Sequence, residues 1–345
     1  MIVNKLNKKL KHKISRIKNQ LFPGAIILMY HRVAEIDSDP WSLCVSPPNF
    51  AEQLEVLQQY GKIISLQELN QKISDRQNIH RSIVITFDDG YADNLYYAKP
   101  LLEKYNVPAT VFITTSGIDR EREFWWDELD RLLLQPGILP NFLSLKIDGV
   151  TYKWELREVN NYSLVDFKGD RWWRMEQETD PTSRHSLYRS LYQKLQHLPI
   201  LERAYLLEQI RIWANAGSFR RSTHCSLSEK EIAILESGGL IEIGAHTINH
   251  PCLSQLPIST QRDEIQHSKD YLETILGHSV TSFSYPNGSY ALATTSLVRE
   301  AGFKCACCSI TGRVQSHSNN FLLPRFVVED WDGETFSQWL SKSIA

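Results

Sequence analysis

Residues 83–90 have the sequence Ile-Val-Ile-Thr-Phe-Asp-Asp-Gly. Its first five residues are apolar or β-branched, as in a strand buried on both faces. Two adjacent carboxylates follow, and neighbouring side chains at a strand end point to opposite faces. Gly90 permits a sharp turn directly after them. Asp88 and Asp89 are therefore able to perform two separate tasks, although an Asp-Gly turn with an incidental second acid is the alternative.

Other short runs of the same β-rich character are spread along the chain. Segments with apolar residues at helical spacing lie between most of them. Strands that alternate with helices indicate a parallel sheet, in which functional groups gather at the carboxyl ends of the strands. We therefore expect an α/β protein, a distorted (β/α) barrel of about seven parallel strands, at residues 26–30, 83–87, 109–113, 240–244, 281–285, 304–308 and 325–328.

Residues 119–239 interrupt this alternation. They contain helix-like segments, such as 127–134 and 185–213, but few runs that resemble strands. We expect a mostly helical insertion or cap here. The predicted division of the chain is a basic amphipathic segment over 1–22, a barrel from 23–118 and 240–345, and the insertion over 119–239.

The composition is that of a globular protein. Of the 345 residues 42% are hydrophobic and 23% charged, and the net charge is −2, which together exclude a disordered chain and argue against a nucleic-acid binder. No apolar run approaches the roughly 20 residues of a membrane-spanning helix. The six cysteines form no C-x-x-C pair and suit a reducing compartment. We expect a cytoplasmic or peripheral membrane location.

Residues 1–20 carry seven basic side chains and no acidic one. Apolar residues recur among them every three or four positions, which predicts a basic amphipathic helix. Such a helix either lies on an anionic membrane surface or docks, solvated, on the domain. The apolar region of a signal peptide would have to be residues 21–30, which contain Pro23 and Gly24, so we expect no signal peptide.

A histidine pair follows another strand-like run. Residues 240–250 have the sequence Leu-Ile-Glu-Ile-Gly-Ala-His-Thr-Ile-Asn-His, which ends with His246 and His250. A spacing of four places two imidazoles on one side of a helical turn. Two histidines and one carboxylate leave a zinc-like ion with an open position for water. A structural histidine pair is the alternative, but the Asp pair on another strand favours a metal site.

His31 directly follows the apolar strand predicted over 26–30. A parallel barrel would place it at the same mouth as the carboxylates and the histidine pair. A lone histidine at a strand end is usually a packed or capping residue. The metal site predicted at the neighbouring strand ends gives His31 a second, catalytic interpretation.

Three ordered motifs resemble those of the NodB-type polysaccharide deacetylases, carbohydrate esterase family 4: Thr-Phe-Asp-Asp-Gly at 86–90, His-Thr-Ile-Asn-His at 246–250 and Ser-Tyr-Pro-Asn-Gly at 284–288. The early Tyr-His-Arg-Val at 30–33 is similar to the branch that contains the poly-N-acetylglucosamine deacetylases, in which the acid histidine precedes the Asp pair. The resemblance covers about residues 25–118 and 240–330.

This resemblance implies a role for each side chain. Asp89, His246 and His250 would hold a divalent metal, zinc in the first place, with cobalt or nickel as alternatives. Asp88 would be the general base and His31 the general acid. The implied substrate is an N-acetylated amino sugar of a polysaccharide or glycan precursor, and the implied activity is hydrolysis of a non-peptide carbon–nitrogen bond.

One departure from the family pattern concerns the catalytic aspartate. Many members have an arginine just before the proline motif, which orients the catalytic aspartate, whereas here the run is Ser-Phe-Ser-Tyr-Pro at 282–286. Arg325 or Arg32 is the candidate replacement. Further candidates are Asp127, to orient the acid histidine, and four side chains to bind sugar: Tyr285, Pro286, Trp125 and Trp126.

The sequence leaves two other functions open. The missing arginine favours a glycan-binding homologue with impaired catalysis, whereas the intact Asp88, Asp89, His246, His250 and His31 oppose it. An amidase acting on a non-sugar carbon–nitrogen bond is the second alternative. Release of acetate from a glycan separates both from a polysaccharide deacetylase.

Overall fold

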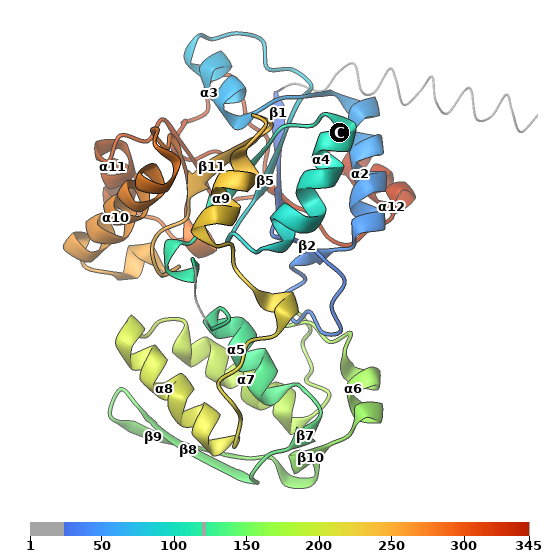
Figure 1. Cartoon of the computed structure of the whole chain (residues 1–345), viewed down its shortest axis with the longest axis vertical. Helices are drawn as coiled ribbons and strands as arrows, with labels where there is room; N and C mark the ends of the chain where they lie inside the picture. Colours follow the sequence, from blue (N-terminus) through green and yellow to red (C-terminus); the bar gives the residue numbers. More distant parts are fainter. Residues whose placement is uncertain (1–23, 119–121, 345) are drawn as a thin grey trace, which may run out of the picture.

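The computed structural model describes residues 24–118 and 122–344. Figure 1 shows two lobes, one built around the sheet and one formed by the insertion, in green and yellow. The predicted basic helix over residues 1–20 lies outside the described residues. No helix in the described part of the chain is both long enough and apolar enough to cross a bilayer.

The sheet confirms the predicted fold class, because its strands are parallel and form an incomplete, distorted barrel. All seven predicted strands are present among the described residues, with no end shifted by more than one position. In sheet order they are β13 (Cys305–Cys307), β12 (Ser282–Ser284), β11 (Ile241–Ala245), β6 (Ala109–Ile113), β5 (Ser82–Phe87), β1 (Ala25–Tyr30) and β14 (Phe326–Val327), and β4 (Lys62–Ile63) pairs with β5.

Helices cover the sheet because each has one apolar stripe to bury. In α2, for example, Phe50, Leu54 and Leu57 lie in the core at helical spacing. A reciprocal Ser228–Glu231 capping box begins α9, and left-handed Gly277 ends α10. The helices of this lobe are α2 (Pro47–Tyr60), α3 (Leu66–Ser74), α4 (Lys99–Tyr105), α9 (Glu229–Glu236), α10 (Ile258–Leu276), α11 (Leu292–Glu300) and α12 (Gly333–Ile344), and a π-helix, η1 (Asn94–Ala98), precedes α4.

The described residues of the insertion pack around a hydrophobic core of their own, which includes Leu129, Leu191 and Ile210. We therefore propose that the predicted region 119–239 is one insertion into the barrel, whose last helix, α9, packs against the barrel core through Ile232 and Leu235. Its elements are α5 (Trp125–Leu133), α6 (Leu164–Asp170), α7 (Ser183–Leu195), α8 (Ile200–Trp213), the hairpin of β8 (Phe142–Ile147) with β9 (Val150–Glu155), and the pair β7 (Gly137–Ile138) with β10 (Asn161–Tyr162).

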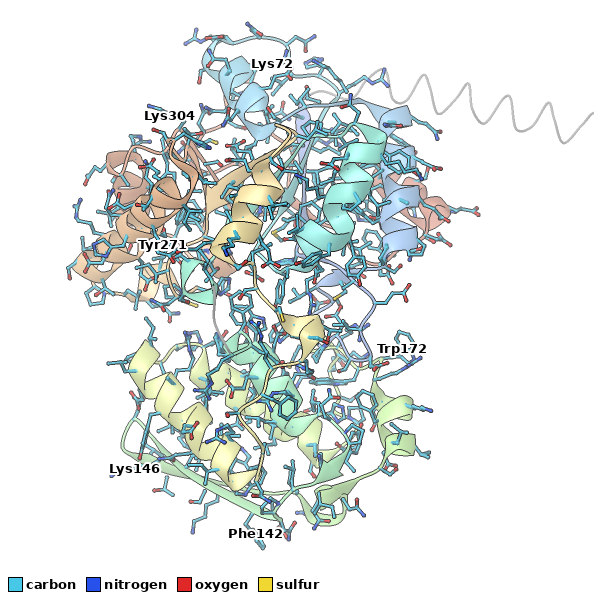
Figure 2. All side chains as sticks on the ribbon, in the orientation of Figure 1. Lys72, Phe142, Lys146, Trp172, Tyr271 and Lys304 are labelled. Carbon is cyan, nitrogen blue, oxygen red and sulfur yellow. The ribbon has the colours of Figure 1, made fainter. Side chains whose placement is uncertain are left out.

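Two details of the insertion differ from the sequence-based expectation. The helical segment predicted over 185–213 is two helices, because Pro199 precedes α8 and α7 has already ended at Leu195. The β8–β9 hairpin was not expected, although Asp148 and Gly149 form its turn with φ of 50° and 78°. Figure 2 shows Phe142 and Lys146 of β8 at the end of this lobe farthest from the sheet.

Short elements complete the description. β2 (Arg32–Val33) and β3 (Cys44–Val45) pair with each other directly after β1. The remaining short helical turns are η2 (Thr115–Gly117), η3 (Arg157–Asn160), η4 (Ser222–His224), η5 (Leu253–Gln255) and η6 (Pro286–Gly288).

Candidate active site

Side chains from three strand ends meet at one mouth of the barrel. Asp88 and Asp89 follow β5, His246 follows β11, and His31 follows β1. These parallel strands belong to one sheet, so their carboxyl ends lie at the same edge. All four side chains, together with His250, line one cavity of about 170 Å³. The structure thus brings together the five residues on which the sequence interpretation rests.

Three of these side chains have the arrangement of a metal site. Asp89 Oδ1 lies 3.6 Å from His246 Nε2 and 3.4 Å from His250 Nε2, and one ligand atom from each residue lies within 4.8 Å of the others. Asp89 Oδ1 is buried and accepts no hydrogen bond within the described structure. A buried carboxylate oxygen without a donor requires a partner, and a divalent cation fits this donor set.

The protonation of the two imidazoles also suits a cation. Burial lowers the pKa of His246 and lowers that of His250 well below its ordinary value, so both rings are neutral at pH 7. The His246 Nδ1 atom lies 2.8 Å from the carbonyl oxygen of Ser284 and donates to it in the neutral ring. This bond leaves the lone pair of Nε2 on the side of Asp89. Outer hydrogen bonds of this kind usually orient a histidine that binds a metal.

Two of the candidate ligands and one neighbouring residue have a strained backbone. Asp89, Thr247 and His250 have φ of 73°, 66° and 55°, in the left-handed region that a β-branched residue such as Thr247 rarely adopts. Residues 246–250 therefore form an irregular loop, and the expectation of one helical turn carrying both imidazoles was wrong. Strained residues of this kind persist where the surrounding structure fixes them.

A buried glutamate on α10 fixes this loop. The Glu264 carboxylate accepts hydrogen bonds from the backbone N–H groups of Ile248 and Asn249, both at 2.9 Å, and from the Asn249 side chain at 2.8 Å. The His250 N–H donates to Thr247 Oγ1 at 3.0 Å. Sequence analysis missed Glu264, because nothing in the sequence of an amphipathic helix indicates which loop it contacts.

Asp88 forms a different contact. Its carboxylate accepts two hydrogen bonds of 2.7 Å from Arg325, one at each oxygen. The Arg325 side chain is fully buried and also donates to Thr86 Oγ1, Ser284 Oγ and the Cys308 carbonyl. Arg325 therefore makes the contact with Asp88 that we expected of a replacement for the motif arginine. Arg32, the other candidate, pairs instead with Asp93 at 2.9 Å.

Neighbouring charges give the two adjacent aspartates opposite properties. Burial would raise the pKa of Asp88, but the guanidinium of Arg325 and the neighbouring histidines hold it well below its usual range. Burial, followed by the charges of Asp88 and Asp127, raises the pKa of Asp89 well above its usual range. Asp88 is thus a fixed carboxylate, whereas Asp89 gains a proton more readily than an ordinary aspartate unless a bound cation stabilises its charge.

His31 lines the cavity beside Asp88 and is partly accessible to solvent. Burial lowers the pKa of its imidazole to about 4, and the charge of Asp88 opposes this effect. The Asn94 side chain donates to the His31 carbonyl at 3.0 Å and holds this segment in place. The imidazole is therefore neutral at pH 7 until a negative charge develops next to it.

Aromatic side chains form one wall of the cavity. The Trp126 ring lies 4.9 Å from the His250 ring, and its indole N–H donates to Tyr91 Oη at 2.8 Å. Trp41 and Tyr192 line the same cavity with ring centroids 4.1 Å apart. Sequence analysis did not single out these last two residues, because neither lies near a motif. Their only signal is the abundance of aromatic residues in and around the insertion.

Trp125 faces a neighbouring space. It stacks on Tyr192 with ring centroids 4.8 Å apart, and the Arg203 guanidinium lies 5.0 Å above its ring. Trp125 and Trp126 both line a second cavity, of about 360 Å³. His250 lines this cavity as well as the cavity of about 170 Å³ that holds the candidate metal ligands. Both tryptophans therefore line cavities next to the candidate metal ligands, and a sugar-binding role for either remains a prediction.

Tyr285 lies in the hydrophobic core and not in the cavity. Its side chain is fully buried against Phe283 and Tyr290, and its hydroxyl donates to the Phe321 carbonyl at 3.0 Å. Pro286 is buried as well. The expected sugar contact by these two residues is therefore replaced by packing, and the next residue, Asn287, lines the cavity instead.

We predict that Tyr285→Phe lowers the free energy of unfolding by about 1 kcal/mol, because it removes one buried hydrogen bond and leaves the ring in place. Denaturant unfolding monitored by fluorescence measures this difference. Tyr205→Phe, at an exposed position, is the matched control. An unchanged unfolding midpoint for Tyr285→Phe would contradict a structural role for the hydroxyl.

Asp127 contacts Tyr91 and not the His31 ring. The Tyr91 hydroxyl donates to Asp127 Oδ2 at 2.8 Å, and Arg221 donates to the Asp127 carbonyl at 2.7 Å. The predicted orienting contact from Asp127 to the acid histidine is thus absent from the hydrogen bonds of the described structure. Asp127 instead ties α5 of the insertion to the residue that follows Gly90.

Asp127 also predicts a pH dependence of stability. Burial raises its pKa from 3.8 to about 7, so between these pH values the folded chain keeps a proton that the unfolded chain has lost. Stability therefore falls as the pH rises, by up to about 1.4 kcal/mol per pH unit from this group. We expect Asp127→Asn to flatten the decline in urea unfolding energy between pH 4.5 and 7. Parallel curves for both proteins would contradict this assignment.

Comparison with known proteins gives a family match. The family model described as polysaccharide deacetylase matches residues 75–138 and 188–306, which together are more than half of the chain. The Bacillus subtilis protein YxkH is 30% identical over 114 residues, which are 32% of this chain and 39% of that protein. The chain therefore matches well under half the length of this curated relative.

Solved structures show the same fold at low identity. The Streptococcus pyogenes deacetylase PplD, in complex with acetate, is 18% identical with a TM-score of 0.56 over 91% of this chain and 97% of its own. IcaB from Ammonifex degensii is 16% identical with a TM-score of 0.57 over 94% and 98%. Since both span nearly the whole chain, the fold they share extends to the insertion lobe.

Proposed function

The chain belongs to the polysaccharide deacetylase family, and from this premise we propose that it is a metal-dependent hydrolase that removes N-acetyl groups from amino sugars of a polysaccharide. One observation carries the proposal. The buried Asp89 carboxylate oxygen, without a hydrogen-bond donor, faces two neutral imidazoles beside a separately fixed Asp88. A site that only bound glycan would have no need for this division of the two carboxylates.

Asp89, His246 and His250 would hold the cation. When bound there, a divalent ion polarises the acetyl carbonyl and lowers the pKa of a coordinated water. Zinc suits two imidazoles and one carboxylate, and cobalt and nickel are the alternatives to test. The chain's own contribution is a site of low dielectric in which both histidines are already neutral and oriented.

Asp88 acts as the general base. It is ionised over the whole neutral range because Arg325 stabilises its charge, and it lines the cavity that admits the substrate. It takes the proton from the attacking water as the oxygen bonds to the acetyl carbon. Its low pKa makes it a weak base, so position rather than basicity accounts for its effect.

His31 acts as the general acid. An amine leaves only after its nitrogen has been protonated, and His31 lines the cavity beside Asp88. Negative charge that develops on the acetyl oxygen raises the pKa of the imidazole, so the proton that Asp88 has taken from water passes to His31, which then donates it to the leaving nitrogen. Transfer to that nitrogen breaks the carbon–nitrogen bond and releases acetate and a free amino sugar.

Acetate release tests the function directly. Purified protein loaded with one equivalent of Zn²⁺ is incubated with N-acetylated oligosaccharides, and acetate is quantified in the supernatant. We expect release by the loaded protein and none after chelation, with activity restored by added Zn²⁺ or Co²⁺. Binding of the oligosaccharide without any acetate would instead identify a glycan-binding homologue. Release from a simple acetanilide but from no sugar would identify an amidase.

The position of Arg325 bears on the alternative of a glycan-binding homologue with impaired catalysis. The missing motif arginine was the feature that favoured impaired catalysis, and Arg325 makes the corresponding contact with Asp88 from another part of the chain. The similarity to the poly-N-acetylglucosamine deacetylase branch supports polymers of N-acetylated hexosamine as the substrate class. We propose such a polymer, or its precursor, as the natural substrate.

A further inference from the structure

A third and larger cavity, of about 1010 Å³, lies outside the proposed active site. Residues 34–36, which follow β2, and residues 92–97, which follow β5, form one side of it. Residues 220–228 form the other side, where the chain returns from the insertion to α9 (Figure 1). The strands that deliver His31 and Asp88 therefore also deliver the lining of this cavity, so both spaces lie at the same edge of the sheet.

Two adjacent phenol rings line this cavity. Tyr96 and Tyr97 are 58% and 53% exposed, and both belong to the π-helix η1. The buried residues of that helix hold it in place, and among them Asn94 donates to the His31 carbonyl. π-Helical segments are rare and occur frequently at functional sites. The π-helix η1 thus exposes two large rings to solvent, while its buried residues hold its backbone in place.

The rest of the lining is polar. The Tyr96 hydroxyl donates to Glu231, and Glu35, Arg220 and Ser222 supply further polar groups. Apolar lining comes from Ala34, Ile36 and Pro47. A ligand that matches this surface has an apolar face for a phenol ring and hydroxyl groups around its edge. A sugar ring has both properties.

The charge of the lining argues against other ligand classes. Glu35, Asp93 and Glu231 are carboxylates, and Arg220 is the cationic member of the lining. Asp93 is neutralised by its ion pair with buried Arg32. The other charged groups of the lining, two carboxylates and one guanidinium, do not favour a phosphate or another anion. A neutral or partly deacetylated amino-sugar chain is compatible with them.

We propose that this cavity is a second glycan-binding site, which holds sugar rings of the polymer away from the N-acetyl group that reacts. The inference rests on the proposed function for the class of its ligand. It also predicts that the protein distinguishes long from short substrates, because only a chain that occupies both spaces gains the contacts of this cavity.

Two variants test the second site without altering the proposed catalytic residues. Tyr97→Ala removes one stacking ring, and Ser222→Trp fills the cavity from an exposed position. The matched control is Tyr205→Ala, which removes a tyrosine of similar exposure, 63%, on α8. The probe is N-acetylated chitohexaose, titrated by calorimetry into zinc-loaded protein that also carries Asp88→Asn, so that the probe is not consumed.

We expect Tyr97→Ala and Ser222→Trp each to weaken chitohexaose binding about tenfold, the value of one aromatic stacking contact. Tyr205→Ala should bind it like the parent protein. With Asp88 intact, kcat/KM for chitobiose should be the same in all of these proteins. Equal chitohexaose affinity in Tyr97→Ala and Tyr205→Ala would overturn the second site, as would a matching loss in chitobiose turnover. Failure of every protein to release acetate, with the binding difference intact, would overturn only the proposed function.

Discussion

Asp89→Asn is expected to bind no zinc at one equivalent and to release no acetate. The substitution keeps the size of the side chain but removes the charge that the cation would neutralise, in a place where burial already disfavours that charge. Metal content after gel filtration and acetate release are the two measurements. His246→Ala and His250→Ala should have the same effect, since each removes a neutral nitrogen from the group.

The control for this experiment is Glu242→Gln. Glu242 is a carboxylate on β11, the strand that leads to His246, and it accepts a hydrogen bond from Ser282 at 2.9 Å near the opposite end of the strand. This variant should keep one zinc per chain. Zinc retained by Asp89→Asn with the affinity of the unmodified protein would show that Asp89 is not a ligand.

Asp88→Asn is expected to keep its zinc and to lower kcat by about 10²–10⁴-fold, the usual effect of removing a general base. Asparagine still accepts a hydrogen bond from Arg325 but takes no proton from water. Zinc content and kcat measured on one preparation separate this base from the metal ligand next to it. Loss of zinc from Asp88→Asn would reverse the roles assigned to the two aspartates.

The ionisation of Asp88 is tested by the pH profile of an Arg325→Lys variant. In Arg325→Lys the bidentate contact is lost, so burial raises the pKa of Asp88 from its depressed value. A smaller fraction of the base is then ionised at low pH, and the acidic limb of the kcat/KM profile moves to higher pH. Zinc content should not change. An unmoved acidic limb would mean that Arg325 does not control the ionisation of Asp88.

Much of the fold was predictable because its signals are local. Each strand of the incomplete barrel is a short apolar run such as 83–87, whose β-branched residues suit a strand buried on both faces. The missed β8–β9 hairpin also had a local signal, namely Asp148-Gly149 between two alternating segments. The π-helix at Asn94–Ala98 had none, since its sequence does not differ from that of an α-helix.

The site was predictable only in part, because several of its contacts join distant segments. The Asp pair and the histidine pair could be identified from their residue types and their spacing in the sequence. Arg325 was one of two candidate arginines, and only the pairing of β1 with both β5 and β14 brings it to Asp88. Tyr285 was misassigned, because its place in a motif says nothing about which way its ring points, and the ring points into the core.

Two of the unexpected cavity residues come from different parts of the chain. Tyr192 reaches the cavity from α7, and Trp41 from the loop between β2 and β3. No sequence pattern relates these segments to the strand ends, because their meeting depends on how the insertion packs against the barrel. The contacts that Asp127 and Trp126 make with Tyr91 show how that packing is held.

Anomalous diffraction at the zinc edge, from crystals of the protein loaded with one equivalent of Zn²⁺, tests the convergence of these side chains on one ion most directly. The account predicts a single strong peak about 2.0–2.2 Å from the nearest Asp89 oxygen, His246 Nε2 and His250 Nε2, with Asp88 still bound to Arg325. A peak bonded to Asp88, a peak elsewhere on the chain, or no peak at all would contradict it.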